Sequence, residues 1–199
     1  SPYLHHGHVS TFRIAREAYA TGGRGAEKFL DELLTWRELA FNFCAHTDAQ
    51  ELESLDGLPD WAQQTLSDHA ADSRERLRSW ETLARGVTGD LLWDLAQRSL
   101  LRNGELHNNL RMTWGKMIPL WVRSPADSLR LLIDLNHRYA LDGNDPSSYG
   151  GLLWCLGQFD RPFSPEQPVL GTIRPRSTDV HAGPLDPARF RAPIHLSHP

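Results

Sequence analysis

The chain has 199 residues, enough to bury a substantial core as one domain. It carries 21 Lys and Arg against 25 Asp and Glu, a net charge of -4, which argues against a generic nucleic-acid-binding protein. Its apolar runs are short and broken by charge, and no leader pattern is readable, so we expect a soluble, cytoplasmic protein without a membrane span. The start at Ser1, without an initiator Met, predicts a fragment of a larger protein.

Charge is distributed unevenly along the sequence. Residues 1–97 carry 9 Lys or Arg and 16 Asp or Glu, net -7, whereas residues 98–199 carry 12 and 9, net +3. One interpretation is a basic face for an anionic partner; the other, which charge alone favours, is a set of solvated helix faces. The candidate basic face consists of Arg98, Arg102, Arg111, Lys116, Arg123 and Arg130. Cys44 and Cys155 lie in apolar stretches and are expected to be buried thiols.

Helix-period patterns dominate the chain, and period-2 strands are absent, so we predict an all-α helical cluster. Ser10 or Thr11 caps a first helix, which the glycines of 22–25 end. A long amphipathic helix follows, whose apolar side is marked by Phe29, Leu30, Leu33, Leu34, Leu39, Phe41 and Phe43. Asp60 is expected to cap the next helix. We place further helices at about 73–84, 90–102, 105–121, 125–140 and 147–157.

Proline and glycine recur every few residues from Phe159 onward, which predicts an extended wrap instead of regular structure. We expect a helical domain over residues 1–175 and an irregular, Pro-rich tail over 176–199. Pro119 is expected to interrupt the helix predicted for 105–121, because proline lacks a backbone N–H.

Three tryptophans are spaced in an unusual way. Trp93 precedes Trp114 by 21 residues, and Trp121 follows Trp114 by 7. Seven residues are nearly two helical turns, so Trp114 and Trp121 share one face with a rise of roughly 10 Å between them. That is a stepping distance for an electron, whereas an ordinary helical core would more naturally use Leu.

Several polar residues have two interpretations each. His5, His6 and His8 lack a nearby Cys or carboxylate that would complete a metal site, so we predict no metal. Hydrolase and nucleotide-binding loop motifs are absent from the sequence. Glu38 lies among apolar residues, where it either needs a partner or ligand or is a surface carboxylate. Asp142 and Asp145 lie in a turn that ordinary turn chemistry explains, or they form a pocket wall with Arg111.

Several colinear blocks carry a family resemblance. Two of them read His-Asn-Asn-Leu-Arg-Met-Thr-Trp-Gly-Lys (107–116) and Leu-Asn-His-Arg-Tyr-Ala-Leu-Asp-Gly-Asn-Asp-Pro (135–146), and the others are 1–10, 36–44, 58–62, 92–98 and 150–154. Together they cover about residues 1–175 in order, which is far more specific than any single block. In these blocks the chain resembles the C-terminal FAD-binding domain of the photolyase and cryptochrome family, most closely the class II cyclobutane pyrimidine dimer photolyases.

The resemblance implies a light-driven lyase that repairs pyrimidine dimers in DNA by electron transfer from excited reduced FAD, working as a monomer. Its FAD would lie in the helical cluster, beside the Arg111–Asp142 pair and with Asn136 near N5 of the ring. Asn108 and Asp145 are implied as further cofactor contacts. The residues implied to face the flipped dimer are Glu38, Met112 and Trp154. Those implied to pass electrons inward are, from flavin to surface, Trp114, Trp93 and Trp121.

The family's N-terminal antenna domain and most of its Ser/Thr-rich phosphate-binding loop are not found in the sequence, in keeping with a fragment. Two alternatives stay open beside repair. One is a cryptochrome-like FAD-binding blue-light photoreceptor that signals without repairing. The other is a helical interaction module that binds no flavin.

Overall fold

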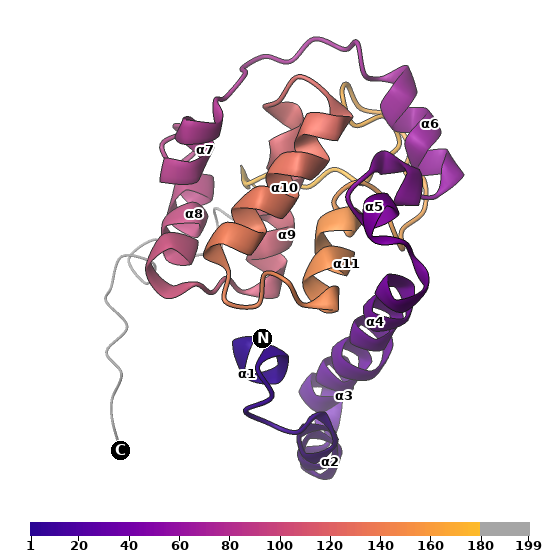
Figure 1. The fold of residues 1–199 in the computed structure, drawn as a ribbon, viewed down its shortest axis with the longest axis vertical. Coiled ribbons are helices and arrows are strands. Elements are labelled where there is room, and N and C mark those ends of the chain that lie inside the picture. The colour runs from indigo at the N-terminus through magenta and orange to yellow at the C-terminus, as the bar shows by residue number, and fades with distance from the viewer. Residues whose placement is uncertain (180–199) are drawn as a thin grey trace.

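The computed structural model describes residues 1–179, and within them it shows helices joined by turns, with one isolated bridge between Gln167 and Gly171 and no strand (Figure 1). The all-α prediction is therefore confirmed. The helices are α1 (Pro2–His5), α2 (Thr11–Thr21), α3 (Gly23–Asp31), the π-helical turn η1 (Glu32–Trp36), α4 (Arg37–His46), α5 (Ala49–Leu52), the 3-10 turn η2 (Leu55–Gly57), α6 (Asp60–Asp68), α7 (Trp80–Arg85), α8 (Leu91–Asn103), α9 (Asn108–Met117), the 3-10 turn η3 (Ile118–Leu120), α10 (Pro125–Tyr139) and α11 (Pro146–Trp154).

The hydrophobic core lies among helices α8 to α11. Trp93, Trp114, Leu132 and Leu153 are fully buried in it. Side-chain caps fix where three of these helices begin: Asp90 accepts from the backbone of Trp93 at 3.0 Å, Ser124 from Asp127 at 3.0 Å and Asp145 from Ser147 at 2.9 Å. Each cap satisfies a backbone N–H that the helix itself leaves unpaired. These starts agree closely with the predicted helices at 90, 125 and 147.

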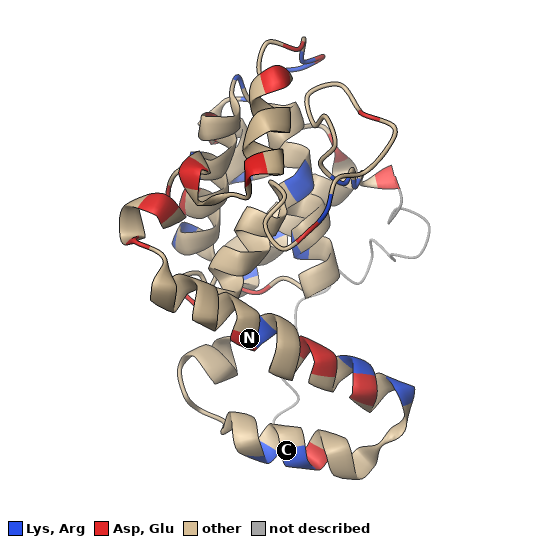
Figure 2. Cartoon of the chain, turned by 90° about the vertical axis from the view of Figure 1, so that its right-hand side faces the viewer, with Lys and Arg blue, Asp and Glu red and all other residues tan. Residues whose placement is uncertain are grey.

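The N-terminal helices form an arm that projects from this core. Helices α2 and α3 pack side by side, and α3, η1 and α4 follow one another without a break (Figures 1 and 2). The break predicted at 22–25 is shorter in the structure and consists of Gly22 alone, because Gly23 already begins α3. Gly22 has a φ of 65°, which lets the chain reverse direction there. Along the predicted apolar side, only Leu33 is buried, whereas Phe29, Leu34 and Leu39 are exposed. Leu30, Phe41 and Phe43 are half-buried, so the predicted apolar side is only partly covered.

Two predicted helix starts also need correction. The helix expected from residue 73 begins only at Trp80, where Ser79 accepts from the backbone of Thr82 at 3.2 Å. Before Trp80 the chain is extended. The backbone N–H of Arg78 donates to the carbonyl of Trp121 at 2.8 Å, so it is not available for a hydrogen bond within a helix. Helix α6 begins at Asp60 itself and has no side-chain cap.

The predicted interruption at Pro119 is confirmed. Helix α9 ends at Met117, and η3 carries the chain through the proline to Trp121. Two of the six members of the candidate basic face, Arg111 and Lys116, are buried and cannot belong to a surface, whereas the other four are exposed. Of the two cysteines, Cys155 is buried as expected and Cys44 is half-buried.

The segment after α11 wraps the helices as predicted. The backbone N–H groups of Val169 and Thr172 donate to Asp72 at 2.9 Å and to Thr65 at 3.0 Å, which fastens the wrap near α6. Arg176 Nε donates to Thr113 Oγ1 at 2.9 Å, so the first residues of the expected tail touch the helical body. The rest of that tail, 180–199, lies outside the described residues. Across 1–179, none of the helices has both the length and the apolar character needed to cross a bilayer.

Helix α9 packs tightly at Gly115 against α10 and the C-terminal end of α11. A Cβ there would lie 2.6 Å from Cys155 Sγ and 3.2 Å from Leu132 Cδ2. We expect overpacking in Gly115→Ala to destabilise the fold by about 1–3 kcal/mol. The better helix propensity of Ala offsets up to about 1 kcal/mol of this loss. Gly25→Ala is the matched control, because Gly25 lies in α3 with open space around it. Urea unfolding measures both, and equal stabilisation of the two variants would contradict the close packing.

Candidate functional site

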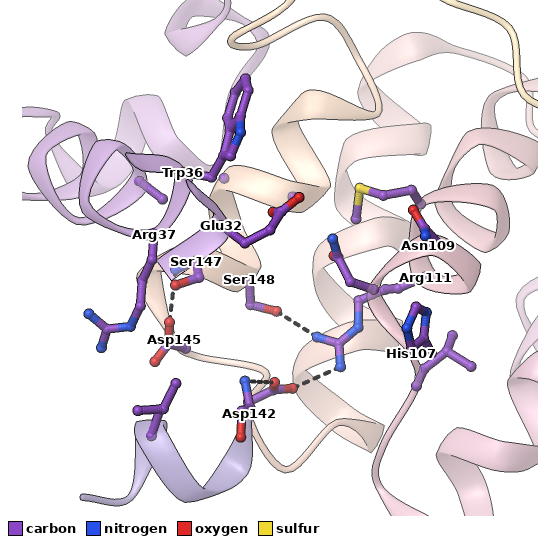
Figure 3. Close-up of a pocket in the computed structure, with 18 of the residues that line it drawn as sticks. Glu32, Trp36, Arg37, His107, Asn109, Arg111, Asp142, Asp145, Ser147 and Ser148 are labelled. Atoms are coloured by element: carbon purple, nitrogen blue, oxygen red, sulfur yellow. Dashed lines mark hydrogen bonds and ion pairs between the residues drawn. The ribbon is translucent and has the colours of Figure 1, made fainter. Parts of the chain in front are cut away.

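A cavity of about 1000 Å³ lies between the α3–η1–α4 segment on one side and α9, α11 and the 141–148 turn on the other (Figure 3). Its size is at the upper end for ligand-binding sites, so it has room for a large cofactor or a cofactor with a substrate. The predicted site residues that line it are Arg111, Asp142, Asp145, Asn108, Met112 and Trp154.

The cavity has a buried polar wall centred on Arg111. Its NH2 group pairs with Asp142 Oδ1 at 2.9 Å, and its NH1 group donates to Ser148 Oγ at 3.2 Å. Asn136 Nδ2 donates to the same Ser148 oxygen at 2.8 Å, whereas Asn136 Oδ1 is buried without a partner among residues 1–179. Burial raises the pKa of the Asp142 carboxyl, the cation of Arg111 lowers it, and the net result lies below the ordinary value.

The turn that carries Asp142 is packed tightly onto the end of α10. A Cβ at Gly143 would lie 2.7 Å from His137 Cα and 2.8 Å from the carbonyl oxygen of Asn136, so only glycine fits there. Asp145 then caps α11. Asp142 and Asp145 are thus held by turn and cap chemistry and also line the cavity, so both interpretations of this turn hold.

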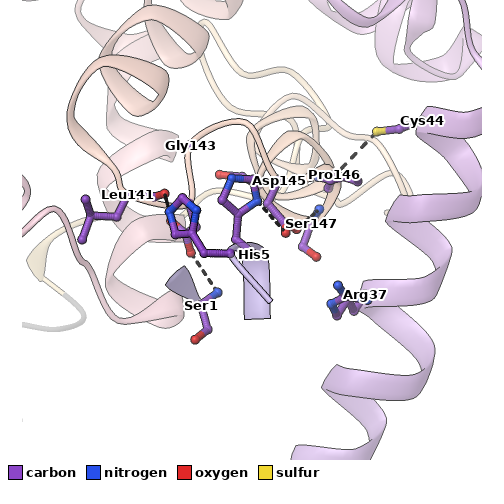
Figure 4. Close-up of polar contacts among 12 residues, drawn as sticks. Ser1, His5, Arg37, Cys44, Leu141, Gly143, Asp145, Pro146 and Ser147 are labelled. Carbon is purple, nitrogen blue, oxygen red and sulfur yellow. Dashed lines mark hydrogen bonds and ion pairs between the residues drawn. The ribbon is translucent and has the colours of Figure 1, made fainter. Parts of the chain in front are cut away.

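Two of the N-terminal histidines contact the same turn. His5 Nδ1 lies 3.2 Å from Asp145 Oδ2, and His6 Nε2 lies 3.1 Å from the carbonyl oxygen of Leu141 (Figure 4). The amino group of Ser1 lies 2.8 Å from Asp142 Oδ2. His5 and His6 therefore stabilise the turn through these contacts. Residues 1–179 contain no group of three His, Cys, Asp or Glu side chains placed to hold a metal.

Met112 and Trp154 form an apolar wall opposite the arm. A Cβ at Gly151 would lie 3.0 Å from Met112 Cε, so the methionine lies directly against α11. The Trp154 ring has two cations near it: Lys116 Nζ at 4.3 Å and the Arg174 guanidinium at 5.8 Å from the ring centroid. These contacts hold the half-buried indole in place from the side away from the cavity.

The structure does not bring Glu38 to this cavity. Its side chain is 61% exposed and pairs with Arg37 at 3.1 Å, so the surface interpretation of Glu38 is correct. The carboxylate that the α3–η1–α4 segment contributes to the cavity is Glu32, which lies with Trp36 on the π-helical turn η1 (Figure 3). Neither Glu32 nor Trp36 is predicted as a site residue from the sequence. Leu33 and Ala40, two turns apart, are buried, and this register, which only the packing reveals, puts Glu38 on the opposite face.

The three tryptophans lie behind the cavity wall and form a contact chain. The rings of Trp93 and Trp114 are stacked, with centroids 5.9 Å apart and planes at 12°. Trp93 also meets Trp121 edge-to-face at 5.4 Å. Trp93 and Trp114 are fully buried, and Trp121 is 9% exposed. Trp93 is therefore the middle member, which agrees with the order implied by the resemblance.

Lys116 is an unusual buried cation on the same helix. It is fully buried, and its Nζ has no hydrogen-bond partner among residues 1–179. Burial lowers the pKa of this amine from 10.5 to about 8. The sequence does not indicate this burial, since a basic face for an anionic partner and a set of solvated helix faces would both leave Lys116 exposed.

Comparison with known proteins identifies relatives of one name. The chain is 42% identical over 178 residues to the deoxyribodipyrimidine photo-lyase of Arabidopsis thaliana, which is 87% of this chain and 35% of that protein. It is 40% identical over 174 residues to the protein of the same name from Methanothermobacter thermautotrophicus, covering 87% and 38%, and 40% identical over 178 residues to that from Potorous tridactylus, covering 87% and 33%.

The chain belongs to the photolyase family. It spans about a third of the length of these relatives. No family model matches it. The resemblance described above is thereby confirmed at the level of the photolyase family.

The buried amine of Lys116 makes a stability prediction. Since its pKa is about 8 in the folded chain and ordinarily 10.5, the unfolded chain binds more protons between these values, and the contribution of Lys116 to stability rises with pH across that window. Below pH 8 the full cost of its burial remains, on the order of 3 kcal/mol. We expect Lys116→Met to stabilise the protein at neutral pH and to remove this rise.

Thermal and urea unfolding between neutral and alkaline pH, read as the difference from the unaltered chain, test this prediction. Lys28→Met is the control, because Lys28 is exposed and paired with Asp31 and Glu32. A pH dependence that is unchanged by Lys116→Met would show that Lys116 keeps its proton and its ordinary pKa inside the fold, and would contradict the prediction.

Proposed function

We propose that the protein binds FAD in the cavity and uses light to split cyclobutane pyrimidine dimers in DNA by electron transfer from excited reduced FAD. The observation that carries this proposal is the juxtaposition of the Arg111–Asp142 wall with the stacked tryptophans directly behind it. The names of the relatives support it, since each is a deoxyribodipyrimidine photo-lyase. When bound, FAD supplies the light absorption and the transferred electron.

The residues present fit such a cofactor. Arg111 is a buried cation whose partner Asp142 fixes its direction, so it favours a negatively charged ring beside it. Asn136 Oδ1 is a buried acceptor that no residue among 1–179 satisfies, and such atoms are rare unless a ligand or water completes them. Asn108 and Asp145 add polar contacts at the rim of the cavity.

The remaining walls suit a flipped pyrimidine dimer. A dimer is poorly stacked and paired in DNA, which lowers the cost of extruding it into a pocket. Trp154 offers a stacking surface and Met112 an adaptable apolar contact. Glu32 takes the role that the resemblance implied for Glu38, a hydrogen bond to the polar edge of a base.

The tryptophans restore the reduced cofactor in this proposal. Trp114 donates an electron to the cofactor. Trp93 then donates an electron to Trp114, and Trp121, the outermost of the three, donates one to Trp93. The contact distances of 5.9 Å and 5.4 Å between ring centroids make each step short.

The proposed activity is tested by reconstituting the protein with FAD and incubating it with dimer-containing DNA in blue light and in darkness. We expect dimers to disappear only in the light. Equal loss in darkness would overturn the proposal. Flavin binding and photoreduction without repair would instead support a cryptochrome-like photoreceptor, and the absence of flavin absorption would support a helical interaction module.

Electron transfer along Trp121, Trp93 and Trp114, the tryptophan relay, is separable from repair. We expect Trp114→Phe to abolish photoreduction of oxidised flavin, because a benzene ring gives up an electron far less readily than an indole. Repair by chemically pre-reduced protein should stay largely intact. Photoreduction is followed by flavin absorbance, and a loss of repair in the pre-reduced variant would mean that Trp114 is structural.

Glu32 and Glu38, two carboxylates of the arm on different faces, give a matched pair. Removing a charge-assisted hydrogen bond costs about 1.5–3 kcal/mol, so we expect Glu32→Gln to lower the repair yield roughly ten- to hundredfold. Glu38→Gln, on the opposite face, should leave it unchanged. The yield of split dimers per absorbed photon measures both, and the reverse pattern would restore Glu38 as the lesion contact.

A further inference from the structure

The two inner tryptophans donate their indole N–H groups to acceptors that take up protons very poorly. Trp114 Nε1 donates to Gln97 Oε1 at 3.0 Å, and Trp93 Nε1 donates to the backbone carbonyl of Trp114 at 2.8 Å. Trp93, Gln97 and Trp114 are all 0% exposed. Amide oxygens accept hydrogen bonds well but are feeble bases. Neither indole therefore has a base or bulk water next to its nitrogen.

Gln97 is held so that its oxygen faces Trp114. Its Nε2 donates to the carbonyl of Ala84 at 3.2 Å, which uses the donor end of the amide and leaves the oxygen for the indole. The turn after α7 presses on the same side chain, since a Cβ at Gly86 would lie 3.2 Å from Gln97 Cβ. Gln97 also follows Trp93 by four residues on α8, so the two side chains share a helix face.

Trp121 differs from the inner pair. It is 9% exposed whereas the inner pair is fully buried, and no residue among 1–179 accepts a hydrogen bond from its indole N–H. The Arg78 guanidinium lies 5.9 Å from its ring. A nearby cation disfavours a positive charge on the ring, so an oxidised Trp121 is driven to release its proton, and water is available to take it.

We propose that Gln97 is a positioning residue of the relay, which fixes Trp114 against Trp93 and keeps oxidised Trp114 protonated until Trp93 reduces it. This inference rests on the proposed function. Trp114 gives one electron to photoexcited oxidised flavin and becomes a radical cation that retains its proton. Trp93 gives one electron to Trp114, and Trp121 gives one to Trp93. Trp121 then releases its N–H proton to water, so the net change is one electron gained by the flavin and one electron and one proton lost by Trp121.

Retention of the proton matters because it lets the electron vacancy, the hole, move on from Trp114 to Trp93. If Trp114 lost its proton, the resulting neutral radical would be a much weaker oxidant and could no longer draw an electron from Trp93. The hole would then stop beside the flavin and recombine with it. A neutral amide at position 97 prevents this stop, whereas a carboxylate of the same size would cause it.

The test is transient absorption after a flash on the FAD-loaded protein with Gln97→Glu, which places a base against Trp114 Nε1. Burial raises the pKa of the introduced carboxyl, so spectra are recorded at a pH high enough to ionise it. We expect the neutral radical of Trp114 to appear in place of the radical cation, and the flavin photoreduction yield to fall at least tenfold, roughly the effect of 1.4 kcal/mol on the competing steps. Gln50→Glu, on an exposed helix surface, is the matched control and should behave like the unaltered protein.

A second measurement uses the unaltered protein and does not depend on the variant folding. We expect the solvent deuterium isotope effect to be confined to the last kinetic step, proton release from Trp121. In flavin-free protein, the Trp114 indole proton should exchange with deuterated water more slowly than that of Trp121 by NMR. An isotope effect on the decay of oxidised Trp114, or an unchanged yield and radical in Gln97→Glu, would overturn the role of Gln97 and leave the relay standing. If the unaltered protein gave no tryptophan radical at all, both the relay and this inference would fall.

Discussion

The buried ion pair between Arg111 and Asp142 is the contact on which the cavity depends. It joins α9 to the turn before α11, and Ser148 extends it to Asn136 on α10. Taking two charges out of water costs several kcal/mol, and an apolar pair of similar volume is often at least as stable. The fold therefore keeps a costly polar network where leucines would serve stability better. A network of this kind is explained by what it presents to the cavity.

Helix α9 divides its residues between two tasks because of its 3.6-residue period. Arg111 and Met112 line the cavity, while Trp114 lies on the core side and stacks on Trp93. Two or three residues along a helix are enough to turn from one face to the other. Any group bound against Arg111 is thus separated from the tryptophan chain by little more than the width of one helix, so binding and electron supply are coupled by local geometry.

The sequence predicted the parts of the fold that local chemistry decides. The capped helices α8 and α10 agree with expectation within one or two residues, as does the break at Pro119. Tertiary contacts decided the rest. Arg78 pairs with the backbone of Trp121 instead of starting a helix, and only packing shows that Glu32, and not Glu38, faces the cavity. Spacing placed Trp114 and Trp121 on one face, but nothing in the spacing shows that Trp93 lies between them.

Charge placement separates the tryptophan chain from the tryptophan of the cavity wall. Lys116 and Arg174 lie close to Trp154, and a positive charge beside an indole makes removal of an electron harder. Trp93 and Trp114 meet neutral acceptors and each other, and within residues 1–179 the cation that lies over a ring of the three is Arg78, at Trp121, their least buried member. On the proposed function, the same electrostatics therefore keeps Trp154 intact as a binding surface, leaves the inner indoles oxidisable, and favours proton loss at the outer end.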